Sequence, residues 1–473
     1  MKIGVNGRFL LKPFTGIGQH TINLIKELAK IDMKNEYIVF AHENVPINIR
    51  KEFPKNVEIR ILPEKKIPSA GARKVWWEQI QIAKILKKEN FEIAYFPYPS
   101  NPWTKDFYGK GMRVFVTVHD CLPWKYKHYN GGILSRTYNN QCKKAVGKAN
   151  KIFTVSKTSK KEISEICKVD SDKIFVIYND AGDIFKKHSM AAGSHPTADS
   201  RIPTTKILEK FALQKNRFFF YCGGYDERKN VSKLVKEYET FIKNYDEEIP
   251  LVLAGGKAIN NDLYKSFDEA KSAFGEIVKT GFLDEEELKS LYENCLAFVN
   301  LSREEGFNIP LVEAANCEAP LIVSNTEIHR EIVGGNADFV DLSKDGNCAE
   351  AMGKMLNPEH RNAFCKNSEA IAKKYSWKTS AKKMKDVLFS GYNFLKYVYR
   401  KFDCRSERFG DFGRLVDYRS RQTFQTFEKR AERSMGADGG RASKKIRSGA
   451  EFDGNCENFC RERRGVARKS RRE

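Results

Sequence analysis

The chain has 473 residues, too many for one hydrophobic core, so at least two domains are predicted. Hydrophobic residues make up 41% and aromatic residues 12%, as in ordinary globular proteins, and no run of eighteen apolar residues predicts a transmembrane helix. The net charge of +22 favours anionic partners such as nucleotide phosphates, acidic lipids or nucleic acid, although solubility alone would also account for it.

The N-terminal segment and the cysteines indicate a reducing compartment. Residues 1–18 lack the continuous apolar stretch of a secretion signal and predict a first strand that runs into a glycine loop. The 11 cysteines are odd in number, scattered, and mostly inside apolar segments, as expected for buried thiols. We therefore expect a cytoplasmic protein, whose basic character would allow peripheral contact with an anionic membrane at its inner face.

The first half alternates short apolar runs with lysine-rich helical segments, a pattern that predicts a parallel α/β sheet. Helices are expected at 19–31, 75–89 and 156–167. We assign residues 1–185 to an N-terminal, Rossmann-like domain. Its predicted strands are 2–6, 37–41, 58–62, 93–97, 113–119, 151–155 and 173–178.

The second half repeats this alternation after a polar segment, 186–206, whose glycine, serine and proline content is typical of a linker. Residues 207–392 are expected to form a second Rossmann-like domain, with helices that include 231–244 and 284–294. Two doubly wound sheets joined in this way place a ligand cleft at their facing strand ends. The predicted strands are 217–222, 250–254, 276–280, 297–300, 320–323 and 337–340.

The composition changes at about residue 393, where arginine replaces lysine and large apolar residues become scarce. Residues 400–473 contain 16 arginines and 5 lysines against 12 acidic residues. We expect residues 393–473 to be disordered, because they have too little apolar surface to fold alone. The abrupt change suggests a shifted reading frame or a fusion; a tail that binds anionic surfaces is the functional alternative.

The most informative segment is 303–325, REEGFNIPLVEAANCEAPLIVSN. A buried strand at 297–300 precedes it, Gly306, Phe307 and Asn308 form a turn, and Pro310 suits the first turn of a helix. Glu305 lies on the turn and Glu313 is expected in the helix's first turn. Free N–H groups at a helix start bind phosphates, and two carboxylates add acceptors for sugar hydroxyls. An ordinary helix start with two solvated glutamates is the alternative.

This segment resembles the Glu-x7-Glu motif of family 4 of the retaining glycosyltransferases, and the resemblance extends over about residues 1–390. It implies the GT-B fold, in which two Rossmann-like domains face a cleft. Two residues depart from the family pattern: Asn308 and Glu318 stand where glycines are common. Asparagine tolerates positive φ well, so the first departure is mild. The second puts the packing of the helix end in question.

A second motif, YCGGYDERKN at 221–230, places a glycine turn and two cations before a helix, which is a phosphate cradle in physical terms. It is similar to the family segment in which a lysine and an arginine neutralise the donor diphosphate. The resemblance assigns these roles to Lys229 and Arg228, although many relatives carry the arginine where Gly224 stands here. A solvated helix start is the alternative, but cations are unfavourable there without an anion.

Three further segments resemble the family. In VTVHDCLP at 116–123, His119 is expected at a strand end, where the family histidine contacts the donor sugar; alone, such a histidine is more often structural. Gly16 and Gly18 open a helix after strand one, where the family loop approaches the donor or acceptor through its backbone. The segment 75–79, VWWEQ, matches a family helix that we expect to pack and to shape the acceptor side.

The resemblance implies transfer of a hexose from a nucleotide-diphosphate sugar to a hydroxyl, with retention of configuration, in polysaccharide or lipopolysaccharide assembly. The assigned catalytic residues are His119, Lys229, Arg228 and Glu305. The assigned donor-binding residues are Gly16, Gly18, Gly224, Gly306, Phe307, Asn308 and Glu313. No cofactor and no metal are expected, and the segment Asp170-Ser171-Asp172 fits a surface turn better than a metal site. The expected acceptor is a glycan or a lipid-linked glycan.

Two other functions remain open from the sequence. A sugar-nucleotide epimerase also has two such domains, but it would need acid and base groups around the sugar that the sequence does not clearly supply. A non-enzymatic binder of nucleic acid or membrane would use the basic residues alone. No RNA-binding or zinc-finger pattern is present, so no specific nucleic-acid partner is expected.

Overall fold

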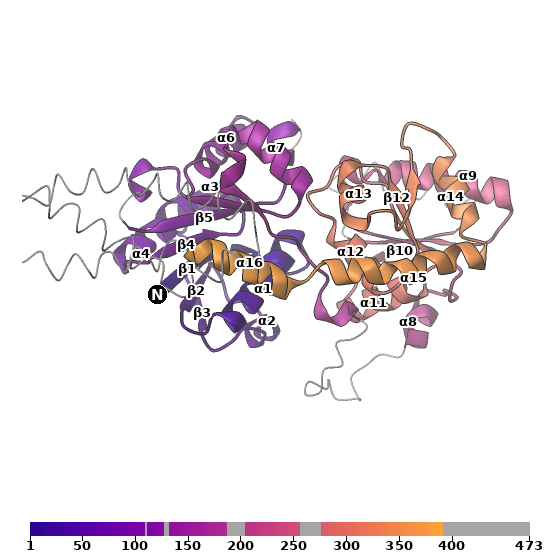
Figure 1. Cartoon of the computed structure of the whole chain (residues 1–473), viewed down its shortest axis with the longest axis horizontal. Helices are drawn as coiled ribbons and strands as arrows, with labels where there is room; N and C mark the ends of the chain where they lie inside the picture. The colour runs from indigo at the N-terminus through magenta and orange to yellow at the C-terminus, as the bar shows by residue number, and fades with distance from the viewer. Residues whose placement is uncertain (109–110, 127–131, 187–203, 256–275, 391–473) are drawn as a thin grey trace, which may run out of the picture. The chain divides into compact units, whose positions relative to one another are not determined.

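A computed structural model describes residues 1–108, 111–126, 132–186, 204–255 and 276–390 (Figure 1). Within these residues it contains two parallel sheets, as the alternating pattern predicts. All thirteen predicted strands form, each within two residues of its expected bounds. The predicted linker lies mostly, and the tail from residue 393 wholly, outside the described residues.

The first sheet has seven strands in the order β3-β2-β1-β4-β5-β6-β7, all parallel. Its apolar residues alternate between two covered faces, because helices pack on both sides of a parallel sheet. The strands are β1 (Lys2–Asn6), β2 (Glu36–Ala41), β3 (Val57–Ile61), β4 (Ile93–Phe96), β5 (Arg113–Val118), β6 (Lys151–Thr154) and β7 (Ile174–Val176).

The helices of this half fill the connections between strands. They are α1 (Gly16–Ile31), α2 (Ile47–Lys51), α3 (Ala70–Trp76), α4 (Ile82–Lys88), α5 (Leu122–Lys125), α6 (Ile133–Val146) and α7 (Lys157–Cys167). Short 3-10 turns are η1 (Arg8–Leu11), η3 (Lys105–Phe107), η5 (Ser171–Lys173) and η6 (Asp183–Phe185). The predicted helix at 75–89 begins earlier, at Ala70, and a π-helical turn, η2 (Trp77–Gln81), joins α3 to α4.

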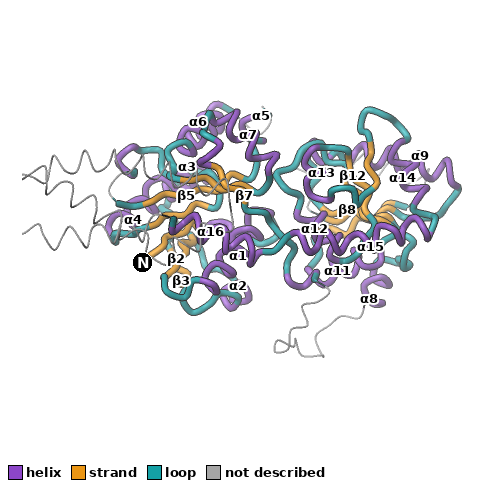
Figure 2. Tube along the Cα trace, viewed as in Figure 1, coloured by secondary structure: helices purple, strands orange, loops and turns teal. Residues whose placement is uncertain are grey.

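The second sheet has six parallel strands in the order β10-β9-β8-β11-β12-β13. They are β8 (Phe219–Cys222), β9 (Leu251–Ala254), β10 (Ile277–Gly281), β11 (Ala297–Asn300), β12 (Leu321–Ser324) and β13 (Asp338–Val340). The helical elements are α8 (Thr204–Lys210), η8 (Glu227–Lys229), α9 (Val231–Tyr245), α11 (Glu285–Asn294), α12 (Ile309–Asn316), α13 (Glu327–Val333), α14 (Asn347–Lys354) and α15 (Pro358–Lys374). Figure 2 shows the strands inside and the helices around them.

The last described helix, α16 (Trp377–Phe389), returns to the first domain, although the sequence analysis grouped it with the second. Lys385 Nζ donates to Ile31 O at 2.6 Å, and Arg113 donates to Leu388 O at 2.9 Å. Trp377 Nε1 donates to Ala181 O at 3.1 Å. The start of α16 therefore contacts the segment that follows β7 in the first domain. Figure 1 shows α16 in orange beside α1.

Each sheet has one point where the strand order reverses direction: between β1 and β4 in the first, and between β8 and β11 in the second. The loops leaving the two strands diverge there, so the carboxyl edge opens into a crevice in which α/β proteins bind ligands. The second crevice carries the candidate functional site.

Candidate functional site

The site is built from two loops at the second crevice. Residues 223–230 follow β8, and residues 301–308 follow β11. A backbone bond from Arg303 N to Arg228 O, 2.7 Å long, joins the loops. The two most informative sequence motifs, 76 residues apart between Lys229 and Glu305, thus meet at one place.

Glu305 is the centre of the cluster. Its Oε1 accepts from Lys229 Nζ at 2.5 Å, and its Oε2 accepts from Arg228 at 2.7 Å. Arg228 also pairs with Asp226 at 3.0 Å, and its side chain donates to Glu304 O at 3.1 Å. The glutamate and the two cations expected to contact different parts of a donor therefore form one charged group in the structure.

The charges of this group are strongly coupled. Burial alone would raise the pKa of Glu305, but the charges and hydrogen bonds of Lys229 and Arg228 outweigh it and lower the pKa to about 2. Only 7% of the Glu305 side chain is exposed, so the carboxylate is ionised and desolvated. Lys229 ends the turn η8, and Asn230 follows with φ 56° before α9 begins. The glycine turn and the two cations lie next to each other, as the sequence predicts, and a carboxylate pairs with both cations.

The turn after Glu305 requires glycine at its first position. A Cβ on Gly306 would lie 2.4 Å from the backbone oxygen of His119, so only glycine fits. Asn308 has φ 80°, the left-handed conformation that asparagine tolerates, and it contacts His329 at 3.0 Å. The side chain of Phe307 packs on Tyr178 and Tyr375 in the core. Only the backbone of Phe307 can therefore face a ligand.

Helix α12 begins at Ile309 with Pro310 in its first turn, as predicted. Glu313 is the fifth residue of the helix and lies just past the first turn, not within it. Glu318, beyond the helix end, has φ 59°. A left-handed residue is the usual end of a helix and favours glycine, so the sequence departure at Glu318 carries a conformational cost.

Glu313 is 2% exposed and accepts from Tyr292 Oη at 3.2 Å and weakly from Gln19 Nε2 at 3.5 Å. Burial raises the pKa of Glu313 to about 7, and Glu285 adds to the effect. A pocket of about 550 Å³ lies beside it, lined by Gln19, Lys26, Glu285 and other residues. The sequence analysis missed Gln19 and Tyr292; position 19 directly follows the predicted glycine loop.

His119 follows β5, and its Nε2 donates to Pro97 O at 2.8 Å. Nδ1 is therefore the unprotonated nitrogen. Burial lowers the pKa of His119 to about 4, so the ring is neutral at pH 7. Its ring lies 4.7 Å from that of His20, which is fully buried and which the sequence analysis did not single out.

The predicted glycines differ in their surroundings. Gly16 and Gly18 form the first turn of α1, which starts three residues before the expected position. A Cβ on Gly18 would lie 2.1 Å from Lys12 O, whereas one on Gly16 would meet nothing within 4 Å. Gly224 O accepts from Tyr221 Oη at 2.5 Å. Close packing against Lys12 thus requires glycine at position 18 but not at position 16. Both glycines belong to the first half of the chain, whereas the charged cluster is built from the second half.

Within the described part of the chain, no group of three metal-ligating side chains could hold an ion, and no helix is long and apolar enough to cross a membrane. Asp170 caps η5 by accepting from Asp172 N at 3.1 Å, an exposed turn as expected.

Two Rossmann-like, parallel sheets make up the GT-B fold, and the charged cluster lies at the crevice of the second sheet, where α/β proteins bind ligands. Residues 204–387 match the family "Glycosyl transferases group 1", and residues 14–179 match "Glycosyltransferase Family 4". The chain belongs to the glycosyl transferases group 1 family. Its membership favours glycosyl transfer over the epimerase and the non-enzymatic binder that the sequence left open.

Relatives of this chain include bacterial mannosyltransferases. The O-antigen chain mannosyltransferase B of Escherichia coli is 24% identical over 379 residues, which cover 77% of this chain and 93% of that protein. The serotype-specific mannosyltransferase WbdA of the same species is 26% identical over 312 residues, 64% of this chain but only 37% of that protein.

Solved structures share the fold. HepE from Anabaena, in complex with UDP and glucose, superposes with a TM-score of 0.61 and 15% identity over 82% of this chain and 100% of that one. WaaG, a glycosyltransferase involved in lipopolysaccharide biosynthesis, gives a TM-score of 0.60 and 13% identity over 82% of this chain and 99% of that one.

Proposed function

We propose that the protein transfers mannose from a nucleotide-diphosphate mannose to a hydroxyl of a growing cell-surface glycan, with retention of configuration. The mannosyltransferase relatives support the sugar, and their O-antigen names support the pathway. The single observation that carries the proposal is the pairing of Glu305 with Lys229 and Arg228 at the crevice of the second sheet.

The cluster suits a diphosphate leaving group. In the reaction the bond between the sugar's anomeric carbon and the diphosphate oxygen breaks, and negative charge develops on the diphosphate. Lys229 and Arg228 would stabilise that charge in a largely desolvated place, where electrostatic stabilisation is strong. Glu305, displaced from the cations by the phosphates, would then accept hydrogen bonds from hydroxyls of the sugar.

Glu313 would hold the nucleotide ribose, since a buried carboxylate in a pocket is an acceptor for two neighbouring hydroxyls. His119, neutral at pH 7, would contact the donor sugar through its free Nδ1. The acceptor oxygen would attack on the face from which the diphosphate leaves, and its proton would pass to the departing phosphate oxygen. This route needs no covalent intermediate on the protein and retains the anomeric configuration.

A panel of nucleotide sugars tests the proposal. Thermal shift and calorimetry with GDP-mannose, UDP-glucose, UDP-galactose and free GDP, UDP and ADP should show binding of at least one sugar nucleotide, with GDP-mannose the strongest. Proton NMR of the transferred sugar should show the anomeric configuration of the donor. No binding by any of these compounds would refute the proposal, and an inverted product would refute the retaining mechanism.

We further propose that the acceptor is a glycan or lipid-linked glycan and that the protein works at the cytoplasmic face of the membrane. The lipopolysaccharide and O-antigen context of its relatives supports this setting. Fractionation of cells, with a salt wash of the membranes, would test it.

A further inference from the structure

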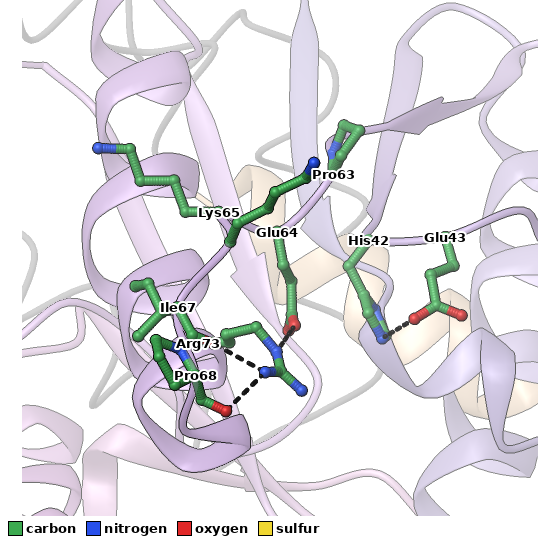
Figure 3. A pocket seen from close by; sticks show the side chains of 9 residues that line it. His42, Glu43, Pro63, Glu64, Lys65, Ile67, Pro68 and Arg73 are labelled. Carbon is green, nitrogen blue, oxygen red and sulfur yellow. Dashed lines mark hydrogen bonds and ion pairs between the residues drawn. The ribbon is translucent and has the colours of Figure 1, made fainter.

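His329 is a buried histidine of the second domain that takes no part in the proposed donor contacts. It lies on α13, is 0% exposed, and has hydrogen-bond partners at both ring nitrogens. His42 has a different setting: it lines a pocket of about 630 Å³ in the first domain, where its Nε2 lies 3.8 Å from Glu43 Oε1 (Figure 3). A ring that is enclosed and bonded at both nitrogens is held in one orientation.

The partners of His329 show which ring nitrogen carries the hydrogen. Nδ1 lies 3.0 Å from Ser324 O, an atom that can only accept, so the hydrogen is on Nδ1. Nε2 then accepts from Asn308 Nδ2 at 3.0 Å. Burial lowers the pKa of His329, and the charges of Glu305 and Lys229 act on it in opposite directions. The ring is therefore neutral at pH 7 and lies close to the charged cluster.

Ser324 extends this network to the other side of Glu305. Its Oγ lies 2.9 Å from His329 Nδ1 and donates to Ser302 O, so its hydrogen is not shared with the ring. Ser302 precedes Glu305 in the loop after β11, and Asn308 follows it at the start of α12. The network of these four hydrogen-bonded residues thus fastens both ends of the segment that carries Glu305.

Asn308 is the end of the segment that depends most on the histidine. It has a left-handed φ of 80°, and its Oδ1 has no partner within the described residues. Turning the amide over would place Oδ1 against Nε2 of His329, and both atoms are acceptors, so the histidine fixes the direction of the amide. The backbone of Gly306 and Phe307 lies between this fixed amide and Glu305.

We propose that His329 is a positioning residue for glycosyl transfer, which holds the segment 302–308 so that Glu305 and the following turn meet the donor sugar in one geometry. The inference rests on the proposed function, because it assigns a further residue to the same donor site. His329 touches no reacting atom and acts through Asn308 and Ser324. Its loss should lower the turnover number but not the affinity for the free nucleoside diphosphate.

Two substitutions separate this role from a structural one. In His329→Gln the amide oxygen can take the place of Nε2 and accept from Asn308, whereas in His329→Asn the shorter amide can only replace Nδ1 at Ser324. Each variant leaves one buried polar group unpaired, so urea unfolding should show similar losses of stability. Turnover should fall about tenfold or more in His329→Asn and stay within about threefold of the wild type in His329→Gln, since small misplacements have effects of up to 10².

His360→Asn is the matched control. His360 belongs to α15 of the same domain, and its Nε2 lies 2.8 Å from Asp338 Oδ2. Asp338 begins β13, at the amino edge of the sheet, whereas the donor site lies at the carboxyl edge. The control removes a bonded histidine without touching the segment 302–308, so it should keep the wild-type turnover number.

Asn308→Gly tests the same contact from the other side and does not disturb the histidine. Glycine adopts the left-handed conformation freely, so this variant should fold, and its turnover should fall as in His329→Asn. The double variant should be no slower than either single one, because both remove one interaction. Losses that multiply in the double variant would overturn the inference.

Initial rates are measured with the nucleotide sugar that the wild type prefers, and affinities for GDP and UDP by calorimetry. Equal turnover in His329→Gln and His329→Asn, or turnover that falls together with nucleotide affinity, would show that His329 only supports the fold. A wild-type protein that binds no sugar nucleotide would contradict the proposed function itself. A wild type that transfers sugar, with no difference between the two His329 variants, would contradict only this inference.

Discussion

Lys229 Nζ lies 2.5 Å from Glu305 Oε1, so the cation assigned to the donor diphosphate is held by a carboxylate. The pair holds the Lys229 ammonium in position beside the second crevice. Under the proposed function, the donor phosphates would take the place of the carboxylate at Lys229, so one anion would replace another there.

Lys229→Ala should reduce turnover by about 10²–10³-fold, because it removes one preorganised charge from the leaving group. The measurement is the initial rate of mannosyl transfer, with circular dichroism to check the fold. Lys236→Ala is the control. Lys236 is an exposed lysine on the next helix, α9, and its replacement should keep the wild-type rate. Near-wild-type turnover in Lys229→Ala would contradict the assignment.

Glu305→Gln should destabilise the protein by about 3 kcal/mol at pH 7, because it leaves two cations without their buried partner. The pKa of Glu305 is lowered to about 2 in the folded state, so its stabilisation is full above the unfolded value near 4.5. It is lost as the pH falls from there toward 2. Urea unfolding should therefore show a difference between the variant and the wild type at pH 7 that shrinks below pH 4.5. A difference independent of pH would be inconsistent with this pairing.

Glu313 should have the opposite dependence. Its pKa is raised from 4.5 to about 7, so the folded state holds the proton more tightly and loses stability as the pH rises from 4.5 through 7. Glu313→Gln removes this loss, and its stability relative to the wild type should increase by about 3 kcal/mol between pH 4.5 and pH 8. Urea unfolding at both pH values measures it. The exposed Glu359→Gln serves as the control and should show no such change.

Gly306→Ala should lower turnover by about tenfold or more, since misplacing a positioning loop by about 1 Å has effects of up to 10². Its Cβ would meet His119 O at 2.4 Å, and relief of that clash must move the loop that carries Glu305. Gly335→Ala is the matched control, because a Cβ there meets nothing within 4 Å. Equal rates in the two variants would argue against a close approach at Gly306.

Glu318→Gly should stabilise the protein by about 0.5–1 kcal/mol. The left-handed conformation of a non-glycine residue costs about 1–2 kcal/mol, and the greater freedom of glycine in the unfolded chain offsets part of the gain. Thermal unfolding at pH 7 would show the increase. A lower melting temperature would mean that the glutamate side chain contributes more than its backbone strain removes.

Local patterns predicted much of this structure. The apolar runs of β1 and β11 match their expected bounds, because a strand buried on both faces is a continuous apolar run in sequence. Pro310 likewise marked the start of α12. The glycine turns were recognisable from composition and from the family resemblance.

Contacts between distant segments were not predictable in this way. Nothing in the segment around Lys229 indicates that its ammonium binds Glu305, because that pairing depends on the order of β8 and β11 in the sheet. The π-helical turn at Glu78 could not be predicted either, because the sequence there has an ordinary helical period. The return of α16 to the first domain depends on tertiary packing, and its lysine-rich sequence resembles that of the other surface helices.

The contact of Trp377 with Asp180 and Ala181 has a consequence for the C-terminal helix. Trp377 N donates to Asp180 Oδ2 at 3.4 Å, and its indole donates to Ala181 O, so the first residue of α16 is fixed to the segment that follows β7. All three residues are buried, so removing the helix would leave a carboxylate and a backbone carbonyl without these donors. A chain that ends before Trp377 should therefore lose stability in its first domain, although every strand of that domain lies earlier in the sequence.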